Sequence, residues 1–76
     1  MIMKSTLANR LRQCRKESQL TQREVATYAD ITEKAYQNYE LSTREPKLEI
    51  ITRIANVYHV SIDYLVGRTD NKSVNK

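Results

Sequence analysis

Apolar residues recur at helical spacing along almost the whole chain, and this periodicity limits the possible folds more than any other feature of the sequence. No stretch shows the alternation of polar and apolar residues that is typical of a half-buried strand. One Gly and one Pro also leave few places where a helix must break. The sequence therefore predicts an all-α fold.

The chain has 76 residues, which is enough for one small domain and too few for two. We expect residues 1–67 to form this domain and the polar residues 68–76 to be a disordered C-terminal tail. A single cysteine cannot form an internal disulfide, and a single histidine leaves no Cys/His cluster for zinc. Packing alone must then stabilise the domain, and we expect no metal and no other cofactor.

The sequence contains no apolar run near the roughly 18 residues of a membrane span, and its first residues are too few for the core of a signal peptide. We therefore expect a soluble cytoplasmic protein without a membrane partner. The sequence also lacks a nucleophile paired with a base, an acidic cluster with metal spacing, and a glycine-rich phosphate loop. These gaps predict that the chain is not an enzyme.

The net charge of +4 is unevenly distributed. Residues 1–23 contain six basic side chains and one acidic side chain, whereas residues 24–49 contain three basic and six acidic ones. A basic balance suits a partner that carries phosphates but does not require one. Any phosphate-binding surface must therefore be assembled by folding, with its basic residues supplied by the first helix and the loops.

Five helices are expected from the periodicity and from the signals at their ends. Pro46 ends any helical continuation before Lys47, and Gly67 supplies a left-handed stop. The apolar stripe is strongest in the fourth helix, where it comprises Leu48, Ile51, Ile54, Ala55 and Tyr58. The predicted bounds are about residues 6–17, 21–28, 33–40 and 48–58, followed by a short helix that Ser61 caps.

The second and third helices carry the clearest start signals. Thr21 is placed to cap the second helix, Glu24 to close a capping box, and Leu20 to pack on Val25 as a hydrophobic staple. Thr32 caps the third helix after a tight turn. Two short helices joined by a tight turn are the geometry of a helix-turn-helix, in which the second helix enters the major groove of DNA.

Five fragments, in the same order and at the same spacing, closely resemble the XRE family of Cro-type and phage-repressor-type regulators. They are LRQCRKE at 11–17, LTQREVA at 20–26, YE at 39–40, REP at 44–46 and VSIDYLVG at 60–67. The resemblance implies a compact five-helix, lambda-repressor-like domain in a transcriptional repressor that binds double-stranded DNA sequence-specifically. It also implies a homodimer on a near-palindromic operator.

The chain departs from the family pattern at three positions where glycine is common. Asp30 stands in the turn before the third helix, Ser42 follows that helix, and His59 follows the fourth. Asp and His tolerate a positive φ better than most residues, so we expect Asp30 and His59 to keep their turns at some cost. Ser42 leaves the shape of the loop after the third helix open.

By this resemblance, the outward face of the third helix reads bases. Lys34 can donate to guanine O6 and N7, Asn38 can pair with adenine N6 and N7, and Glu33 can accept from cytosine N4. The Glu33 carboxylate is otherwise repelled by the DNA backbone unless it pairs with Lys34. The alternative is an ordinary solvated helix face. The predicted base-reading residues are Glu33, Lys34, Gln37 and Asn38.

The resemblance also places contacts to DNA phosphates around this helix. Gln22 matches the family residue that hydrogen-bonds a phosphate and sets the register of the helix on DNA. Thr32 can cap its helix while a phosphate binds beside it. Tyr36 is expected to be mainly a core residue, with a hydroxyl free to touch a phosphate. The predicted phosphate contacts are Gln22, Thr32, Tyr36, Arg44 and Lys47, although each could instead have an ordinary surface or core role.

Glu40 lies at the C-terminal end of the third helix, where the helix dipole is unfavourable to a negative charge, so we expect a cation nearby. In the family, the residue that matches Arg15 supplies this cation. We therefore predict a structural ion pair between Arg15 and Glu40 that joins the first helix to the third.

Two kinds of protein partner are open at this point. An apolar patch left over among Tyr58, Ile62 and Tyr64 would be the natural contact between two copies of the chain. The alternative function is that of an antitoxin or adapter with the same fold, whose main partner is another protein. The excess of acidic residues over 24–49 favours that alternative, because the reading helix is not itself basic.

Overall fold

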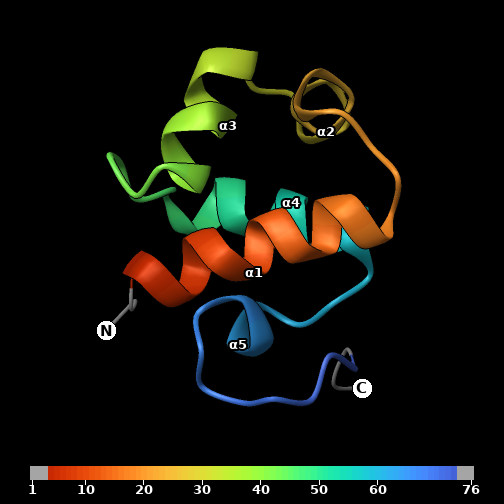
Figure 1. Cartoon of the computed structure of the whole chain (residues 1–76), viewed down its shortest axis with the longest axis vertical. Coiled ribbons are helices and arrows are strands. Elements are labelled where there is room, and N and C mark those ends of the chain that lie inside the picture. Colours follow the sequence, from red (N-terminus) through yellow and green to blue (C-terminus); the bar gives the residue numbers. More distant parts are fainter. Residues whose placement is uncertain (1–3, 74–76) are drawn as a thin grey trace.

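The computed structural model describes residues 4–73, and the ends of the predicted domain and tail, 1–3 and 74–76, lie outside the described residues. All five predicted helices are present (Figure 1). They are α1 (Lys4–Glu17), α2 (Gln22–Ala29), α3 (Glu33–Glu40), α4 (Leu48–Tyr58) and α5 (Ile62–Leu65). The described residues contain no strand, so the all-α fold class is confirmed. None of these helices is both long and apolar enough to cross a membrane.

The five helices enclose one core. α2 and α3 lie at one end of the molecule, α1 and α4 cross its middle, and α5 lies at the other end (Figure 1). α3 packs on α2 and α1, and α2 also packs on α4, while α5 packs on α1 and α4. The two helices of the predicted helix-turn-helix are therefore supported by α1 and α4.

The apolar stripes of the helices meet in this core. Leu11 of α1, Val25 of α2, Ile54 of α4 and Leu65 of α5 are fully buried. Burying one such side chain stabilises the fold by roughly 1.5–3 kcal/mol. The prediction that Leu48 belongs to the buried stripe of α4 is wrong, because this first residue of the helix projects past the core and is 73% exposed.

The predicted caps are present as hydrogen bonds. The Glu24 amide donates to the Thr21 hydroxyl at 3.0 Å, and the Thr21 amide donates to the Glu24 carboxylate at 2.9 Å, which completes the capping box. Thr32 caps α3 by accepting from the Ala35 amide at 3.1 Å, and Ser61 caps α5 in the same way. One such cap is worth about 1 kcal/mol, so the starts of these short helices are fixed locally.

Four described residues other than glycine have a left-handed backbone, namely Gln19, Asp30, Ser42 and His59, with φ between 57° and 62°. Asp30 and His59 keep their turns as predicted, and Ser42 adopts the conformation that glycine favours. Gln19 has no sequence signal for it. A residue with a Cβ adopts this conformation at a cost of roughly 1–2 kcal/mol.

Residues 68–73, for which the sequence predicts a disordered tail, lie against the domain. The Arg10 guanidinium donates to the carbonyls of Tyr64 at 2.5 Å and Thr69 at 2.6 Å, and to the Asp70 carboxylate at 2.7 Å. The same guanidinium lies 4.2 Å from the centre of the Tyr64 ring. The Lys72 ammonium also pairs with the Glu17 carboxylate at 2.9 Å, and the Ser61 amide donates to the Lys72 carbonyl at 3.1 Å. Polar contacts alone therefore hold this segment against the domain.

Of the three residues among which the sequence left an exposed apolar patch open, two lie in the core. Tyr58 and Tyr64 are buried, and only Ile62 is partly exposed. The large apolar side chains that the described part of the chain leaves exposed are Tyr28, Leu41 and Leu48.

Cys14 lies on the buried side of α1. Burial raises the pKa of its thiol, because an apolar environment disfavours the thiolate, and the positive charges of Lys72 and Arg10 offset this only in part. The side chain therefore behaves as a small hydrophobic residue.

Replacing His59 by glycine is expected to raise the free energy of unfolding by about 1 kcal/mol. His59 is exposed and left-handed, so glycine removes backbone strain without removing a packed side chain. For a domain of this size the melting temperature should rise by roughly 4–8 °C, measured by circular dichroism. Asn56→Gly, at an exposed position inside α4, is the control and should lower stability by about 0.5 kcal/mol. A His59→Gly variant that is no more stable than the parent would contradict the strain.

Candidate nucleic-acid interface

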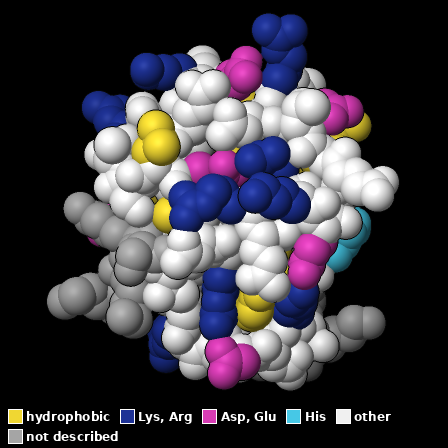
Figure 2. Space-filling model, viewed as in Figure 1, with side chains coloured by type: hydrophobic (Ala, Val, Ile, Leu, Met, Phe, Trp, Pro, Cys, Tyr) yellow, Lys and Arg dark blue, Asp and Glu magenta, His cyan; other side chains and the backbone are white. Residues whose placement is uncertain are grey.

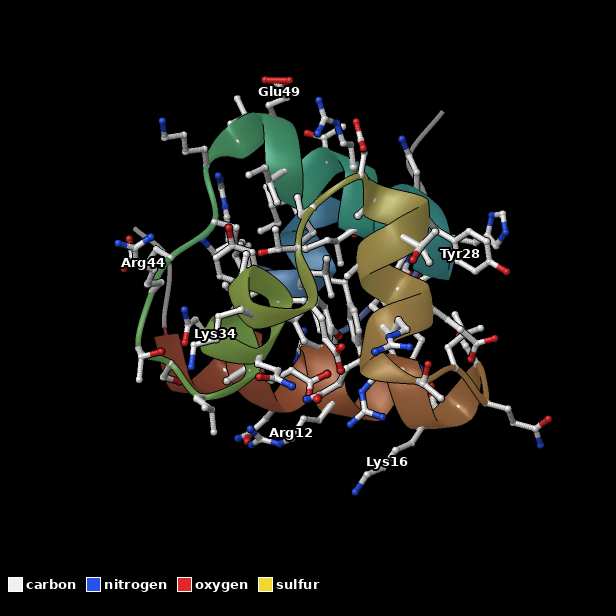
Figure 3. The ribbon with its side chains drawn as sticks, turned by 90° about the horizontal axis from the view of Figure 1, so that it is seen from above. Arg12, Lys16, Tyr28, Lys34, Arg44 and Glu49 are labelled. Atoms are coloured by element: carbon white, nitrogen blue, oxygen red, sulfur yellow. The ribbon has the colours of Figure 1, made fainter. Side chains whose placement is uncertain are left out.

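α3 has an inner face and an outer face. The residues that it buries against the core are Tyr36, Tyr39 and Glu40. On the outer face Lys34 is exposed and points away from the molecule (Figure 3). The other predicted base-reading residues are half-buried, and they are Glu33, Gln37 and Asn38. Helical spacing thus separates the four predicted reading residues from the residues that anchor the helix.

The Asn38 side chain is held from the loop that follows α3. The Thr43 hydroxyl lies 3.2 Å from Asn38 Oδ1 and 3.1 Å from the Asn38 carbonyl oxygen. The Thr43 amide donates to the same carbonyl at 3.0 Å. Because an amide oxygen has two lone pairs, Oδ1 can accept from Thr43 and from an adenine amino group together. Thr43 therefore fixes the orientation of the Asn38 side chain, although no sequence signal pointed to it.

The ion pair of Glu33 differs from the one that sequence reasoning considered. Its carboxylate lies 3.5 Å from Nε of Arg23 on α2, and no pair with Lys34 occurs among the described residues. Arg23 is mostly exposed, so the pair adds little to stability. Its consequence is electrostatic, because a cation beside Glu33 reduces the repulsion between this carboxylate and a phosphate backbone.

Gln22, the first residue of α2, turns its side-chain amide toward the end of α3. Its Nε2 donates to Glu40 Oε1 at 3.0 Å. A primary amide has two N–H groups, so the second one can still donate to a phosphate oxygen. Glu40 therefore limits the directions in which Gln22 can present that donor.

The remaining predicted phosphate contacts are exposed around α3. Thr32 stands at the helix start, where free amides and the helix dipole favour an anion. Arg44 and Lys47 are exposed in the loop between α3 and α4. They line a shallow hollow beside Tyr39 and Ile50.

The predicted contact between Tyr36 and a phosphate is wrong. Tyr36 is 0% exposed, and its hydroxyl lies 2.5 Å from the Tyr58 hydroxyl and 3.5 Å from the Leu11 carbonyl oxygen. Burial raises the pKa of both tyrosines, so both stay protonated. Tyr36 has the core role that the sequence also predicted. Its hydroxyl is paired with the Tyr58 hydroxyl and not with a phosphate.

The predicted ion pair between Arg15 and Glu40 is present. Arg15 Nε donates to Glu40 Oε2 at 2.8 Å, and its Nη2 donates to Oε1 at 3.2 Å. Glu40 is 2% exposed. Desolvation acts to raise the pKa of its carboxyl group, but hydrogen bonds from Arg15, Tyr36 and Gln22 outweigh it and hold the pKa below the usual value. The carboxylate therefore stays charged and joins α1, α2 and α3.

Sequence reasoning named no residue of α1 for the interface, yet two basic side chains of this helix border it. Arg12 donates to the Glu40 carbonyl and so lies at the C-terminal end of α3, and Lys16 is exposed one turn further along α1. Figure 3 shows both along one edge of the molecule, Arg44 at the adjoining edge and Lys34 over α3 between them, whereas Glu49 lies at the far edge. Figure 2 shows Lys and Arg side chains gathered over the middle of the molecule, where α1 crosses in Figure 1. The basic excess of residues 1–23 was the signal for them.

Chemically, this face offers hydrogen-bond donors and positive charges at fixed positions. In the part of the chain that the structure describes, no three His, Cys, Asp or Glu side chains are grouped as metal ligands. The arrangement suits binding to a polyanion with edges that accept and donate hydrogen bonds.

Residues 11–65, more than two thirds of the chain, match the helix-turn-helix family. The chain belongs to this family. It is 42% identical over 64 residues to the uncharacterized HTH-type transcriptional regulator YqaE of Bacillus subtilis, covering 84% of this chain and 55% of the relative. It is 32% identical to the HTH-type transcriptional regulator ImmR of the same organism, covering 93% and 56%. It is 35% identical to the cryptic phage CTXphi transcriptional repressor RstR of Vibrio cholerae, covering 83% and 57%. No solved structure matches the chain.

Membership confirms the predicted XRE-type family and the lambda-repressor-like helix-turn-helix fold. The family is one of transcriptional regulators and not of enzymes, as predicted. The chain spans about half the length of the curated relatives that it matches.

Acid is expected to destabilise the domain partly through Glu40. A carboxyl group whose pKa is lowered in the folded state stabilises that state fully above its unfolded pKa, near 4.3, and loses this contribution as the pH falls through the folded-state value. Glu40→Gln should therefore lower the free energy of unfolding at pH 7 by about 3 kcal/mol, because Arg15 loses its partner. Between pH 7 and pH 3 the variant should lose less further stability than the parent.

Urea unfolding at several pH values measures this difference. The exposed Glu45 provides the control, since Glu45→Gln should leave the curve of the parent unchanged. Equal acid sensitivity of the parent and Glu40→Gln would show that the carboxylate does not carry the effect.

Proposed function

We propose that this chain is a cytoplasmic repressor of transcription that binds a near-palindromic operator in double-stranded DNA, sequence-specifically and as a homodimer. The observation that carries the proposal is the position of Lys34 and Asn38 on the outer face of α3, while Glu40 at the end of the same helix is fixed to α1 and α2. A helix held in this way offers the same side chains to every duplex. The name of the Vibrio cholerae relative, a transcriptional repressor, supports the sign of regulation.

Base recognition rests on hydrogen bonds in the major groove. Lys34 donates to a guanine, and Asn38, with its oxygen held by Thr43, pairs with an adenine. Each such pair discriminates against a wrong base by roughly 1–3 kcal/mol. Gln37 lies between them in sequence and can reach a neighbouring base. Glu33 accepts from a cytosine when Arg23 turns toward a phosphate.

Contacts to phosphates surround the reading residues and set the position of α3 in the groove. Gln22 uses its second N–H, and Thr32 presents the N-terminal amides of α3. Arg44 and Lys47 approach from the loop after α3. Arg12 and Lys16 approach from α1, which supplies the basic charge that α3 lacks.

A homodimer on a near-palindromic operator explains how so small a domain achieves specificity. The two copies of α3 must then lie about 34 Å apart, one turn of DNA, on the same side of the duplex. The operator consequently contains two inverted half-sites at that separation.

Selection of binding sites from random duplexes tests the assignment of reading residues. The parent should yield a paired, inverted motif. Lys34→Ala and Asn38→Ala should each lose the preference at one position of each half-site, because a base contact carries sequence information. Gln22→Ala should weaken all sequences alike, because a phosphate contact carries none.

Arg53→Ala is the control for these variants. Arg53 pairs with Glu49 at 2.6 Å, on the edge of the molecule opposite to Arg12 and Lys16, and its loss should not change the motif. Motifs that remain intact in both Lys34→Ala and Asn38→Ala would remove α3 as the reading element.

The dependence of affinity on salt tests the contribution of α1. A dimer that contacts about 6–8 phosphates gives a slope of log K against log salt near −5 to −7. Lys16 makes no ion pair within residues 4–73, so Lys16→Ala should remove one phosphate contact per copy without disturbing the fold. The slope should become shallower by about 1.8 units.

Titration of the operator by fluorescence anisotropy at several salt concentrations gives both slopes. Arg53→Ala should keep the slope of the parent. A parent affinity that does not change with salt would contradict binding through phosphates.

The alternative function, an antitoxin or adapter, is favoured by the acidic excess over residues 24–49, and ion pairs weaken this argument. Three of the acidic residues between 24 and 49 are paired with arginines, in the pairs Glu33–Arg23, Glu40–Arg15 and Glu49–Arg53. These pairs offset half of the six acidic charges of this segment. A stoichiometric protein partner, together with no selected operator, would replace the proposal by this alternative.

A further inference from the structure

The outer face of α3 ends in an exposed leucine. Leu41 directly follows the last residue of the helix and continues its backbone course, with φ −91° and ψ −2°. Its amide donates to the Gln37 carbonyl at 3.0 Å, which is the four-residue spacing of an α-helix. The side chain of Leu41 can therefore be placed by the same periodicity as the reading residues.

This periodicity places Leu41 in the middle of the reading face. Residues three, four and seven positions apart share one face of a helix, and Leu41 stands at these distances from Asn38, Gln37 and Lys34. The residues that α3 buries lie on the other side, and Leu41 is accordingly 68% exposed. A large apolar side chain thus stands among hydrogen-bonding ones, on the surface to which the proposed function assigns the bases.

We propose that Leu41 is a further base-reading residue, which recognises the 5-methyl group of a thymine in each half-site. The inference rests on the proposed function and deepens it, since it adds one residue and one base to the reading of the operator. Leu41 acts through apolar contact, which is different in kind from the hydrogen bonds of Lys34 and Asn38.

The chemistry of the major groove leaves one apolar partner for such a side chain. The base edges in this groove present hydrogen-bond donors and acceptors, together with the methyl group of thymine. The side chain of leucine neither donates nor accepts, so it forms no hydrogen bond with any base. Water that covers Leu41 in the free protein is displaced when α3 enters the groove, and contact with a methyl group makes this displacement favourable.

The proposed phosphate contacts bring the duplex to this end of α3. Arg12 of α1 donates to the carbonyl of Glu40, which directly precedes Leu41 in the chain. Arg44 is exposed in the loop, three residues after Leu41. A duplex that contacts both arginines covers the C-terminal end of α3, and with it Leu41.

Helix geometry predicts where the thymine stands in the operator. Leu41 lies about 4.5 Å beyond Asn38 and about 10.5 Å beyond Lys34 along the helix axis, at a rise of about 1.5 Å per residue. Base pairs are stacked about 3.4 Å apart. The thymine therefore stands about one or two base pairs from the adenine that Asn38 reads, on the side away from the guanine that Lys34 reads.

Selection of binding sites by the parent and by Leu41→Ala tests this position. The parent motif should contain the thymine at the stated place in each half-site. Leu41→Ala should lose this preference and keep those for the guanine and the adenine, because Lys34 and Asn38 are unchanged. Circular dichroism of each variant confirms that it is folded.

Replacing the thymine by uracil tests the contact at the level of a single methyl group. Uracil keeps every hydrogen-bonding atom of the base edge and lacks only the methyl. In the parent, this replacement should weaken binding about fourfold per half-site, the equivalent of about 0.8 kcal/mol for one buried carbon group, and about 15-fold when both half-sites carry uracil. Fluorescence anisotropy with the two operators measures the ratio of affinities.

The variants decide whether Leu41 is the source of this ratio. Leu41→Ala should bind the thymine and uracil operators with nearly equal affinity, and Leu41→Met, which keeps a long apolar side chain, should retain the preference for thymine. Leu48→Ala is the matched control. Leu48 is 73% exposed but belongs to α4, so its variant should keep the ratio of the parent whatever its overall affinity.

The outcomes separate this inference from the proposed function. A parent that selects no operator would overturn both. A parent motif without thymine at the stated position, equal affinity of the parent for thymine and uracil, or an unchanged ratio in Leu41→Ala would overturn the inference alone. The same holds if Leu41→Ala weakens every duplex alike, because a contact with the DNA backbone carries no sequence information.

Discussion

The charge of one buried carboxylate determines how the helices of this domain are arranged. Glu40 accepts hydrogen bonds from Arg15 of α1 and Gln22 of α2, while its own backbone carbonyl accepts from Arg12. An ion removed from water without partners costs several kcal/mol. Any arrangement that separates α3 from α1 or α2 leaves such an ion behind. The ion pair therefore fixes the orientation of α3 more than it adds to net stability. Because of it, a helix of only eight residues keeps a defined direction.

Neutralisation of carboxylates by arginines of other helices also explains how the acidic segment 24–49 can contain a helix of a DNA-binding domain. Arginines from α1, α2 and α4 neutralise Glu40, Glu33 and Glu49 respectively. Positive charge then comes from neighbours of α3 and from its flanking loop. Under the proposed function, this division leaves the outer face of α3 to side chains that can distinguish bases, while the general attraction to phosphates comes from other elements.

Sequence reasoning succeeded where the signals are local. The caps at Thr21, Thr32 and Ser61, together with helical periodicity, placed the five helices, and the resemblance added the pair of Arg15 and Glu40. Contacts that depend on tertiary packing escaped it. The Tyr36 hydroxyl could reach a phosphate or the core by spacing alone, and only the position of Tyr58 decides between them. Residues 68–73 lie against the domain through polar contacts with Arg10, Glu17 and Ser61. Leu48, the first residue of α4, is exposed. Neither fact has a local signature in the sequence.

The position of Cys14 gives the domain an internal reporter of its own motions. The thiolate is the form that reacts with alkylating reagents, and burial disfavours it while the packing of α1 shields the sulfur. Reaction must therefore wait for α1 to lift from the core. The alkylation rate of the natural protein consequently reports how often α1, the helix whose Arg15 pairs with Glu40, separates from the core. Binding of DNA that stabilises the packed position of α1 should slow the reaction.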